Sequence, residues 1–135
     1  MQKLLTIAVD FDGTLVENQY PEIGKPIIFA FETLQKLQQE GHQIILWTYR
    51  HGRKLQEAVE FCKAKGISFY AVNKSYPEEV FDQEMSRKIL ADLFIDDRNI
   101  NGLPPWGEIY HQLTDYKPEA VKTHKKAGLL KFLKK

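Results

Sequence analysis

Residues 4–15 read LLTIAVDFDGTL, a short apolar run that leads into two aspartates and a glycine. The run from Leu4 to Val9 is typical of a strand that is buried on both faces. Asp10 and Asp12 follow it directly, so two carboxylates stand at the carboxyl end of this strand. Gly13 permits a tight turn that aims backbone N–H groups toward a ligand. The segment therefore predicts a buried strand with an acidic site at its end.

Strand and helix patterns alternate along the rest of the chain. Further apolar runs predict strands over residues 43–47, 67–72 and 91–95. Apolar residues at helical spacing predict a helix that begins at Pro26 and stops at Gly41, a second helix over 55–62, and a third after Pro104. This alternation predicts an α/β fold of three layers, in which a mainly parallel sheet carries helices on both faces.

The bulk composition sets limits on the class of protein. A chain of 135 residues with 43% apolar and 27% charged residues suits one soluble domain with one core. The single cysteine, Cys62, excludes an internal disulfide framework and a cysteine-rich zinc site. No segment approaches the roughly 20 apolar residues that span a bilayer, and the N-terminus lacks a signal-peptide pattern. We therefore expect no membrane contact and a cytoplasmic location.

The net charge of +1 is unevenly distributed. Seven of the 19 basic residues but one of the 18 acidic residues lie within 117–135, which leaves residues 1–116 with a net charge of −5. We expect a catalytic domain over 1–115, and a basic helix or tail over 116–135 that belongs to the same domain. A solvated helix face explains the lysines of this tail better than a contact with nucleic acid, which stays open as the alternative.

Polar residues follow three of the four predicted strands. Asp10 and Asp12 follow the first strand, Thr48 the second, and Asp96 and Asp97 the fourth. Ligands bind at the carboxyl ends of parallel strands, so these residues should share one edge of the sheet. Grouped carboxylates repel one another unless a cation compensates, and Mg²⁺ prefers oxygen ligands and phosphate oxygens. The pattern predicts magnesium-dependent chemistry on a phosphate ester.

Each of these residues has an expected role in such a reaction. Asp10 is the expected nucleophile and a metal ligand, because a carboxylate can attack phosphorus and form an aspartyl-phosphate. Asp12 is the expected general acid and base, with its backbone carbonyl on the metal. Thr48 is expected to donate its hydroxyl to a phosphoryl oxygen. Asp97, or alternatively Asp96, completes the metal ligands.

Three motifs in this order resemble those of the haloacid dehalogenase-like (HAD) superfamily of phosphatases. DFDGTL at residues 10–15 resembles the first motif, and LWT at 46–48 resembles the second. Residues 88–98, KILADLFIDDR, resemble the third and fourth motifs of small, capless bacterial members. The resemblance implies a five-stranded Rossmann-like (HAD-like) sheet, a hairpin flap over 16–24, and no cap domain.

The resemblance also implies a lysine that offsets the charge of the phosphate. Lys88 is the expected catalytic lysine, although Ile89 follows it where many relatives have proline, and Lys74 is a competing candidate. The expected substrate contacts are Gly13, Thr14, Tyr49 and Arg50. An open, capless site implies as substrate a phosphorylated small molecule or the phosphorylated end of a macromolecule, with a homo-oligomer as a possible source of a lid.

Three other functions compete with a phosphohydrolase. A response-regulator domain also groups aspartates, a threonine and a lysine, but its acceptor aspartate ends the third strand, where this chain has Asn73. A phosphotransferase would pass the same aspartyl-phosphate to an acceptor other than water. A catalytically idle phosphate-binding module would keep the fold without turnover.

Overall fold

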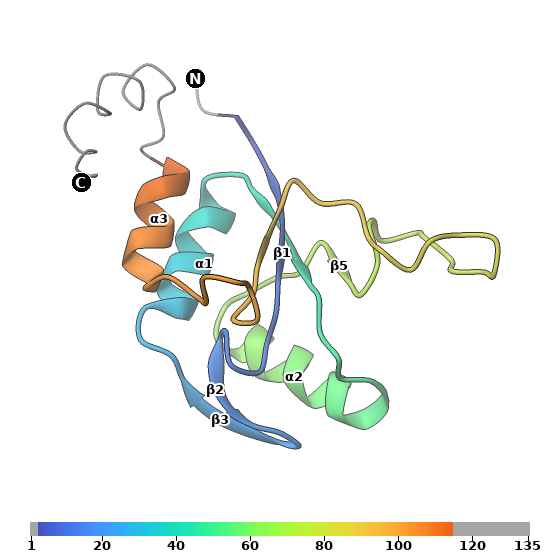
Figure 1. The fold of residues 1–135 in the computed structure, drawn as a ribbon, viewed down its shortest axis with the longest axis horizontal. Helices are drawn as coiled ribbons and strands as arrows, with labels where there is room; N and C mark the ends of the chain where they lie inside the picture. Colours follow the sequence, from blue (N-terminus) through green and yellow to red (C-terminus); the bar gives the residue numbers. More distant parts are fainter. Residues whose placement is uncertain (1–2, 115–135) are drawn as a thin grey trace.

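The protein is an α/β domain with a parallel four-stranded sheet, seen in a computed structural model that describes residues 3–114 (Figure 1). The predicted basic segment 116–135 lies outside the described residues. The elements are β1 (Thr6–Val9), β2 (Val16–Gln19), β3 (Glu22–Pro26), α1 (Ala30–Gln39), β4 (Gln43–Leu46), α2 (Gly52–Ala64), β5 (Ala71–Val72), β6 (Leu93–Ile95) and α3 (Trp106–Thr114). The sheet order is β5-β4-β1-β6. The α/β fold with a parallel sheet is thus confirmed.

Strand β1 is the centre of this sheet. It pairs in parallel with β4 on one side and with β6 on the other, and β5 pairs with β4. Its residues Ile7, Ala8 and Val9 are almost completely buried. The continuous apolar run is explained by this position, since a central parallel strand is covered on both faces. The resemblance implies five strands, whereas residues 3–114 form four in this sheet.

Within residues 3–114, all three helices pack on one face of the sheet, which corrects the prediction of helices on both faces for this part of the chain. Ile7, Val9, Ile44 and Leu46 point to that face and share a core with buried residues of α1, α2 and α3. The chain steps from β1 to β4 and on to β5 in one direction, so right-handed crossovers place α1 and α2 on the same side. Helix α3 then packs beside α1 (Figure 1).

The opposite face of the sheet carries a smaller apolar cluster. Its buried members are Ala8, Ile45, Ala71 and Ile89. Ile89 comes from the long connection between β5 and β6, which recrosses the sheet and contains no helix. A polar segment with Pro77 in it supplies neither the period nor the length of a helix. The described residues therefore form two layers plus a covering loop.

The predicted flap is present and is longer than expected. Strands β2 and β3 form an antiparallel hairpin that extends to Pro26. Pro26 therefore ends the hairpin and does not begin a helix, which is a correction. Helix α1 begins at Ala30, after Phe29 takes a left-handed backbone conformation with φ of 67°. The predicted strands at 67–72 and 91–95 are also shorter in the structure, and each lies at an edge of the sheet with one neighbour.

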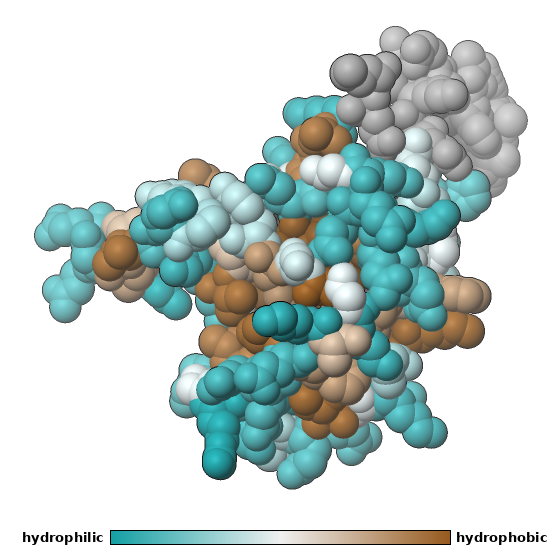
Figure 2. All heavy atoms as spheres, turned by 180° about the vertical axis from the view of Figure 1, so that it is seen from behind, coloured by the Kyte–Doolittle hydropathy of each residue, from teal (hydrophilic) through white to brown (hydrophobic). Residues whose placement is uncertain are grey.

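The face of the molecule drawn in Figure 2 is mainly polar. Seen from behind, hydrophilic residues cover most of the periphery, and hydrophobic atoms show through between them (Figure 2). None of the helices between residues 3 and 114 has the length and apolar character required to cross a membrane.

Replacing Leu37 tests the one-sided core. Leu37 on α1 is fully buried in the cluster that joins the helices to the sheet. Leu37→Ala should lower the free energy of unfolding by about 2–5 kcal/mol, because it removes buried methyl groups and leaves a cavity. Urea unfolding measures the loss. Gln39→Ala, on the exposed side of the same helix, should change stability by less than about 0.5 kcal/mol. Equal effects of both changes would contradict the assignment of the core.

Candidate active site

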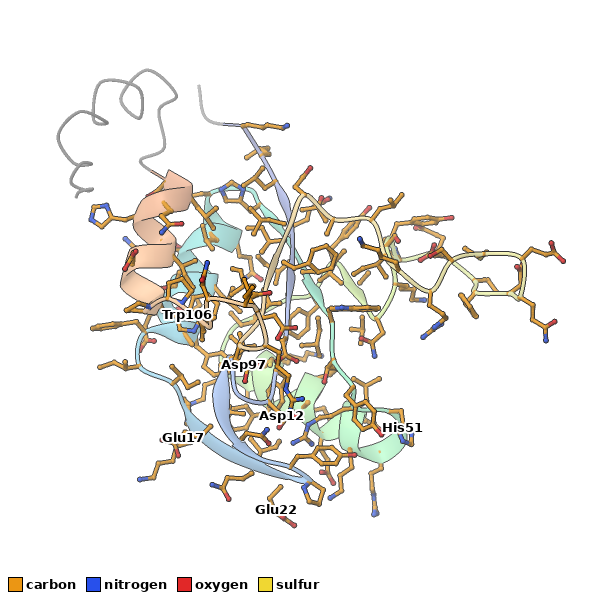
Figure 3. All side chains as sticks on the ribbon, in the orientation of Figure 1. Asp12, Glu17, Glu22, His51, Asp97 and Trp106 are labelled. Atoms are coloured by element: carbon orange, nitrogen blue, oxygen red, sulfur yellow. The ribbon has the colours of Figure 1, made fainter. Side chains whose placement is uncertain are left out.

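The register of the sheet brings the predicted site residues to one edge. Val9 is paired with Leu46 on one side and with Ile95 on the other, so these three strands end at the same level. The ladder continues for one more residue, because the Asp10 N–H donates to the Ile95 carbonyl at 3.0 Å. Asp10 and Asp96 therefore leave neighbouring strands side by side. Figure 3 shows Asp12 and Asp97 at this end of β1, next to hairpin β2–β3.

Asp10, Asp96 and Asp97 form an acidic cluster. One carboxylate oxygen from each lies within 4.8 Å of the others, and all three residues are half-buried. Three carboxylates at this spacing are a donor set for a hard divalent cation, which takes oxygen ligands. The cluster could therefore hold a metal ion. It includes the three residues predicted to bind the metal through their carboxylates, and the metal contact predicted for the Asp12 backbone carbonyl stays a prediction.

The cluster perturbs the titration of Asp10. Burial, with the negative charge of Asp96 as the next cause, raises the pKa of Asp10 from 3.8 to about 7. The Thr14 hydroxyl donates to Asp10 Oδ2 at 3.0 Å and partly opposes this shift. An ionised Asp10 is thus unfavourable in the protein alone, and a bound cation would reverse the balance.

Thr14 and Gly13 lie behind the acidic cluster and shape it. Thr14 is fully buried, and its Oγ1 accepts the Asp97 N–H at 3.0 Å. The Thr14 carbonyl accepts the indole N–H of buried Trp106 at 2.9 Å. At Gly13, with φ of 87°, an added Cβ would lie 2.3 Å from Asp97 Oδ2. The sequence predicts substrate contacts for Gly13 and Thr14, whereas in the structure Thr14 hydrogen-bonds Asp97 and Gly13 leaves room for the Asp97 carboxylate.

Asp12 is held by Arg50 in a two-point ion pair. Arg50 Nε donates to Asp12 Oδ2 and Nη2 donates to Asp12 Oδ1, each at 2.8 Å. The Arg50 side chain is fully buried, and 15% of the Asp12 side chain is exposed. These hydrogen bonds raise the pKa of Arg50 above its ordinary value. Such a bidentate pair fixes the plane of the carboxylate as well as its position.

The rest of the Arg50 guanidinium is bound to hairpin β2–β3 and to α2. It donates to the carbonyl oxygens of Pro21 at 3.1 Å, Glu22 at 2.9 Å and Lys54 at 3.3 Å. The Cζ atom of Arg50 lies 5.1 Å from the ring centres of both Phe11 and Tyr20. The sequence predicts a substrate contact for Arg50, whereas the structure uses all five of its N–H groups within the protein.

Thr48 stands at the predicted strand end with its hydroxyl proton available. The Thr48 Oγ1 accepts the Arg50 backbone N–H at 3.1 Å, so the hydroxyl can still donate. The Thr48 backbone N–H donates to Asn73 Oδ1 at 2.8 Å. Tyr49, another predicted substrate contact, is 85% exposed and meets the flap residue Tyr20 edge to face.

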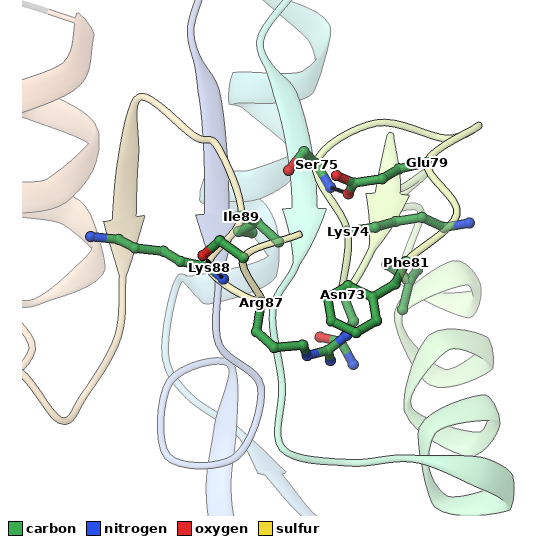
Figure 4. Close-up of a pocket in the computed structure, with 10 residues that line it drawn as sticks. Asn73, Lys74, Ser75, Glu79, Phe81, Arg87, Lys88 and Ile89 are labelled. Atoms are coloured by element: carbon green, nitrogen blue, oxygen red, sulfur yellow. Dashed lines mark hydrogen bonds between the residues drawn. The ribbon is translucent and has the colours of Figure 1, made fainter. Parts of the chain in front are cut away.

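Neither candidate lysine reaches the acidic cluster in this structure. Lys74 Nζ donates to the Pro77 carbonyl at 3.1 Å, and Lys88 forms no ion pair with a carboxylate of the described residues. Figure 4 shows the two side chains extending in opposite directions. The choice between Lys88 and Lys74 therefore stays open.

The turn after β1 leaves one backbone donor unused. The Gly13 N–H donates to the Val16 carbonyl at 2.7 Å, and the Phe11 N–H donates to the Asp10 carboxylate, so neither is available to a ligand. Within residues 3–114, the N–H group of Asp12 has no hydrogen-bond acceptor. This donor lies two residues after Asp10 and suits an anion bound there.

Two residues of the site escape prediction from sequence. Asn73 supports Thr48 from the end of β5, and its position after a strand was the available signal. Trp106 reaches the Thr14 carbonyl from α3, across 92 positions of sequence. No local pattern links Trp106 to the first motif, because the contact depends on where α3 packs.

Comparison with known proteins identifies a solved structure of high similarity. It is described as the structure of a conserved protein coded by a locus of Bacteroides thetaiotaomicron. The two chains are 58% identical, with a TM-score of 0.80, and the match covers 85% of this chain and 93% of the other. No model of a protein family matches the chain, and no curated protein matches it.

The raised pKa of Asp10 predicts the pH dependence of the metal-free protein. Its pKa is about 7 in the folded state against 3.8 when unperturbed, so the folded state binds the extra proton between these values. Stability should therefore fall as the pH rises from about 4 to about 7. Asp10→Asn has no such proton, so wild type should melt below this variant at pH 8 but close to it at pH 5. Melting temperatures in chelator measure the difference. A difference that does not change with pH would contradict the prediction.

Removing Arg50 should destabilise the protein by about 3–5 kcal/mol, because it leaves Asp12 without its buried partner. Urea unfolding of Arg50→Met measures the loss. The double variant Asp12→Asn, Arg50→Met should be more stable than Arg50→Met alone, since no unpaired charge is left. A double variant as unstable as the sum of the two single changes would show that the pair itself matters little.

Proposed function

This chain belongs to the family of the conserved Bacteroides thetaiotaomicron protein, and we propose that it is a magnesium-dependent phosphohydrolase of the haloacid dehalogenase-like superfamily. The grouping of Asp10, Asp96 and Asp97 at the end of the central strand carries this proposal. Asp10 is unfavourable when ionised and needs a cation to stay so, and a phosphate ester needs a cation for transfer. One cation bound at Asp10 would satisfy both requirements.

Mg²⁺, held by Asp10, Asp96 and Asp97, would neutralise charge on the phosphate and keep Asp10 ionised. An Asp10 oxygen then attacks phosphorus, the bond from phosphorus to the ester oxygen breaks, and the leaving oxygen takes a proton from Asp12. Water next attacks the phosphorus of the aspartyl-phosphate and gives a proton to Asp12. This step frees Asp10 and inorganic phosphate.

Backbone and hydroxyl donors support the placement of the phosphate. The unused N–H group of Asp12 and the hydroxyl of Thr48 come from adjacent strand ends. Donors of this kind, fixed before the substrate arrives, stabilise charge on the transferred group without reorganisation. Lys88 is the proposed cation of the same group of residues, with Lys74 as the alternative.

Arg50 acts on Asp12 as a positioning residue. It fixes both carboxylate oxygens, and each oxygen keeps a free lone pair on which a proton can be carried. The same pair binds the flap carbonyls of Pro21 and Glu22, so the general acid and base and the flap are placed together.

Turnover of phosphate esters tests the proposed function. Wild type should release phosphate from some members of a panel of phosphorylated metabolites and 5′- and 3′-phosphorylated oligonucleotides with Mg²⁺, and from none with chelator. Asp10→Asn should reduce turnover to background, because the nucleophile is lost. Asp12→Asn should lower kcat by about 10²–10⁴-fold, because the leaving group loses its proton source.

Glu32→Gln, an exposed change on α1, is the matched control and should retain full turnover. Turnover by Asp10→Asn near that of wild type would refute the assignment of the nucleophile. No turnover across the panel would shift the assignment toward the idle phosphate-binding module. Phosphate transfer to an added alcohol in place of water would identify a phosphotransferase.

A further inference from the structure

A cavity of about 240 Å³ lies beside the carboxyl end of β5. The loop that joins β5 to β6 forms its other wall (Figure 4). Its lining contains three basic residues, Lys74, Arg87 and Lys88, and one acidic residue, Glu79. The cavity is thus basic, although the neighbouring cluster around Asp10 is acidic.

Arg87 is the basic residue best placed to bind a ligand there. Its guanidinium lies over the ring of Phe81, 4.2 Å from the ring centre, and Figure 4 shows it next to Asn73. Stacking on an aromatic ring holds the plane of a guanidinium. No side-chain hydrogen bond or ion pair of Arg87 exists within the part of the chain that the structure describes. Its donors are oriented and unused.

The other charged residues of the lining do not neutralise Arg87. Glu79 is engaged by the Ser75 backbone N–H, which donates to its Oε1 at 2.7 Å. The ammonium groups of Lys74 and Lys88 point away from the middle of the cavity on opposite sides (Figure 4). They add positive charge at its rim. Within the cavity, Arg87 is therefore the basic residue that an anion would contact.

Asn73 joins this cavity to the phosphate site. It lines the cavity, and its Oδ1 accepts the backbone N–H of Thr48. Val72 pairs with Leu46, which pairs with Val9, so β5 ends at the same level as β1. Two strand spacings separate these ends by about 10 Å. A molecule bound at Asp10 can reach Arg87 along the same edge of the sheet.

We propose that the cavity is a specificity subsite in which Arg87 binds a second anionic group of the substrate. The substrate class is then a phosphate monoester whose alcohol part carries a carboxylate or another phosphate. A planar guanidinium fork fits either anion in a two-point arrangement. This inference rests on the proposed function, because it concerns the part of the substrate beyond the phosphate.

Binding of non-hydrolysable phosphonates tests the subsite without turnover. Hexylphosphonate, 6-phosphonohexanoate and hexane-1,6-diyl bisphosphonate share a chain and differ in having no second anion, a carboxylate or a second phosphonate. Titration calorimetry of the full chain with Mg²⁺ compares the affinities. At least one of the two compounds that carry a second anionic group should bind about 10-fold or more tightly than hexylphosphonate. The tighter of the two identifies which anion the subsite takes.

Arg87→Met keeps most of the length of the side chain and removes the charge. It should abolish the preference for the second anion and leave the affinity for hexylphosphonate within about 2-fold. Lys63→Met, an exposed change on α2, removes one positive charge away from the cavity and should keep the preference.

Equal binding of the three compounds by wild type, or a preference that survives Arg87→Met, would overturn the subsite. Loss of the preference in Lys63→Met as well would assign it to overall charge and not to Arg87. If the preference depends on Arg87 but no phosphate ester is hydrolysed, the subsite stands and the proposed phosphohydrolase activity fails. If none of the three phosphonates binds, both fail.

Discussion

The pairing of Arg50 with Asp12 is the interaction on which the geometry of the site depends. One buried guanidinium binds a carboxylate at the end of β1, two carbonyls of hairpin β2–β3 and a carbonyl of α2. The turn after β1, hairpin β2–β3 and the first turn of α2 are therefore fixed to one another by a single side chain. Lysine could not replace it, because an ammonium has three donors and no planar fork.

Burial of this ion pair carries a desolvation penalty that its attraction alone need not offset. Excellent geometry and additional hydrogen bonds reduce that penalty, and Arg50 has both, with five donors used and rings of Phe11 and Tyr20 on its plane. A residue that served stability alone would be better replaced by an apolar side chain. The arrangement is better explained by the need to hold a charged Asp12 in one orientation, beside a flap whose position is coupled to it.

The one-sided arrangement of the helices gives the long β5–β6 connection its role. With α1, α2 and α3 all on one face, the residues between β5 and β6 must cover the other face themselves. Ile89 supplies the apolar contact for this cover, and Arg87 and Lys88 immediately precede it. By anchoring the β5–β6 connection to the sheet, Ile89 thus also fixes the positions of Arg87 and Lys88. The packing of Ile89 on the sheet therefore determines where the positive charges of the cavity lie.

Sequence patterns predicted the central parts of the fold and of the site. The apolar run before Asp10 and the polar residues after each strand sufficed, because parallel strands ending level must bring such residues together. The start of α1 was misplaced because Pro26 satisfies a strand end as readily as a helix start. The one-sided helices followed from strand order, which no local pattern encodes. The hydrogen-bond partners of Arg50 and Thr14 depend on where these side chains are buried. The residue type alone does not reveal whether a side chain binds a ligand or the protein.

The acidic cluster and the basic cavity place opposite charges at two positions along one sheet edge. Asp10, Asp96 and Asp97 stand at β1 and β6, and Arg87 stands beyond β5. A metal ion turns the first position into a site for an anion, so a cation and Arg87 would then face the same ligand from its two ends. A neutral molecule would gain from neither. If the proposed subsite is correct, selection for molecules with two negative ends would follow from the sheet order, since β4 and Thr48 separate the two charged positions by a fixed distance.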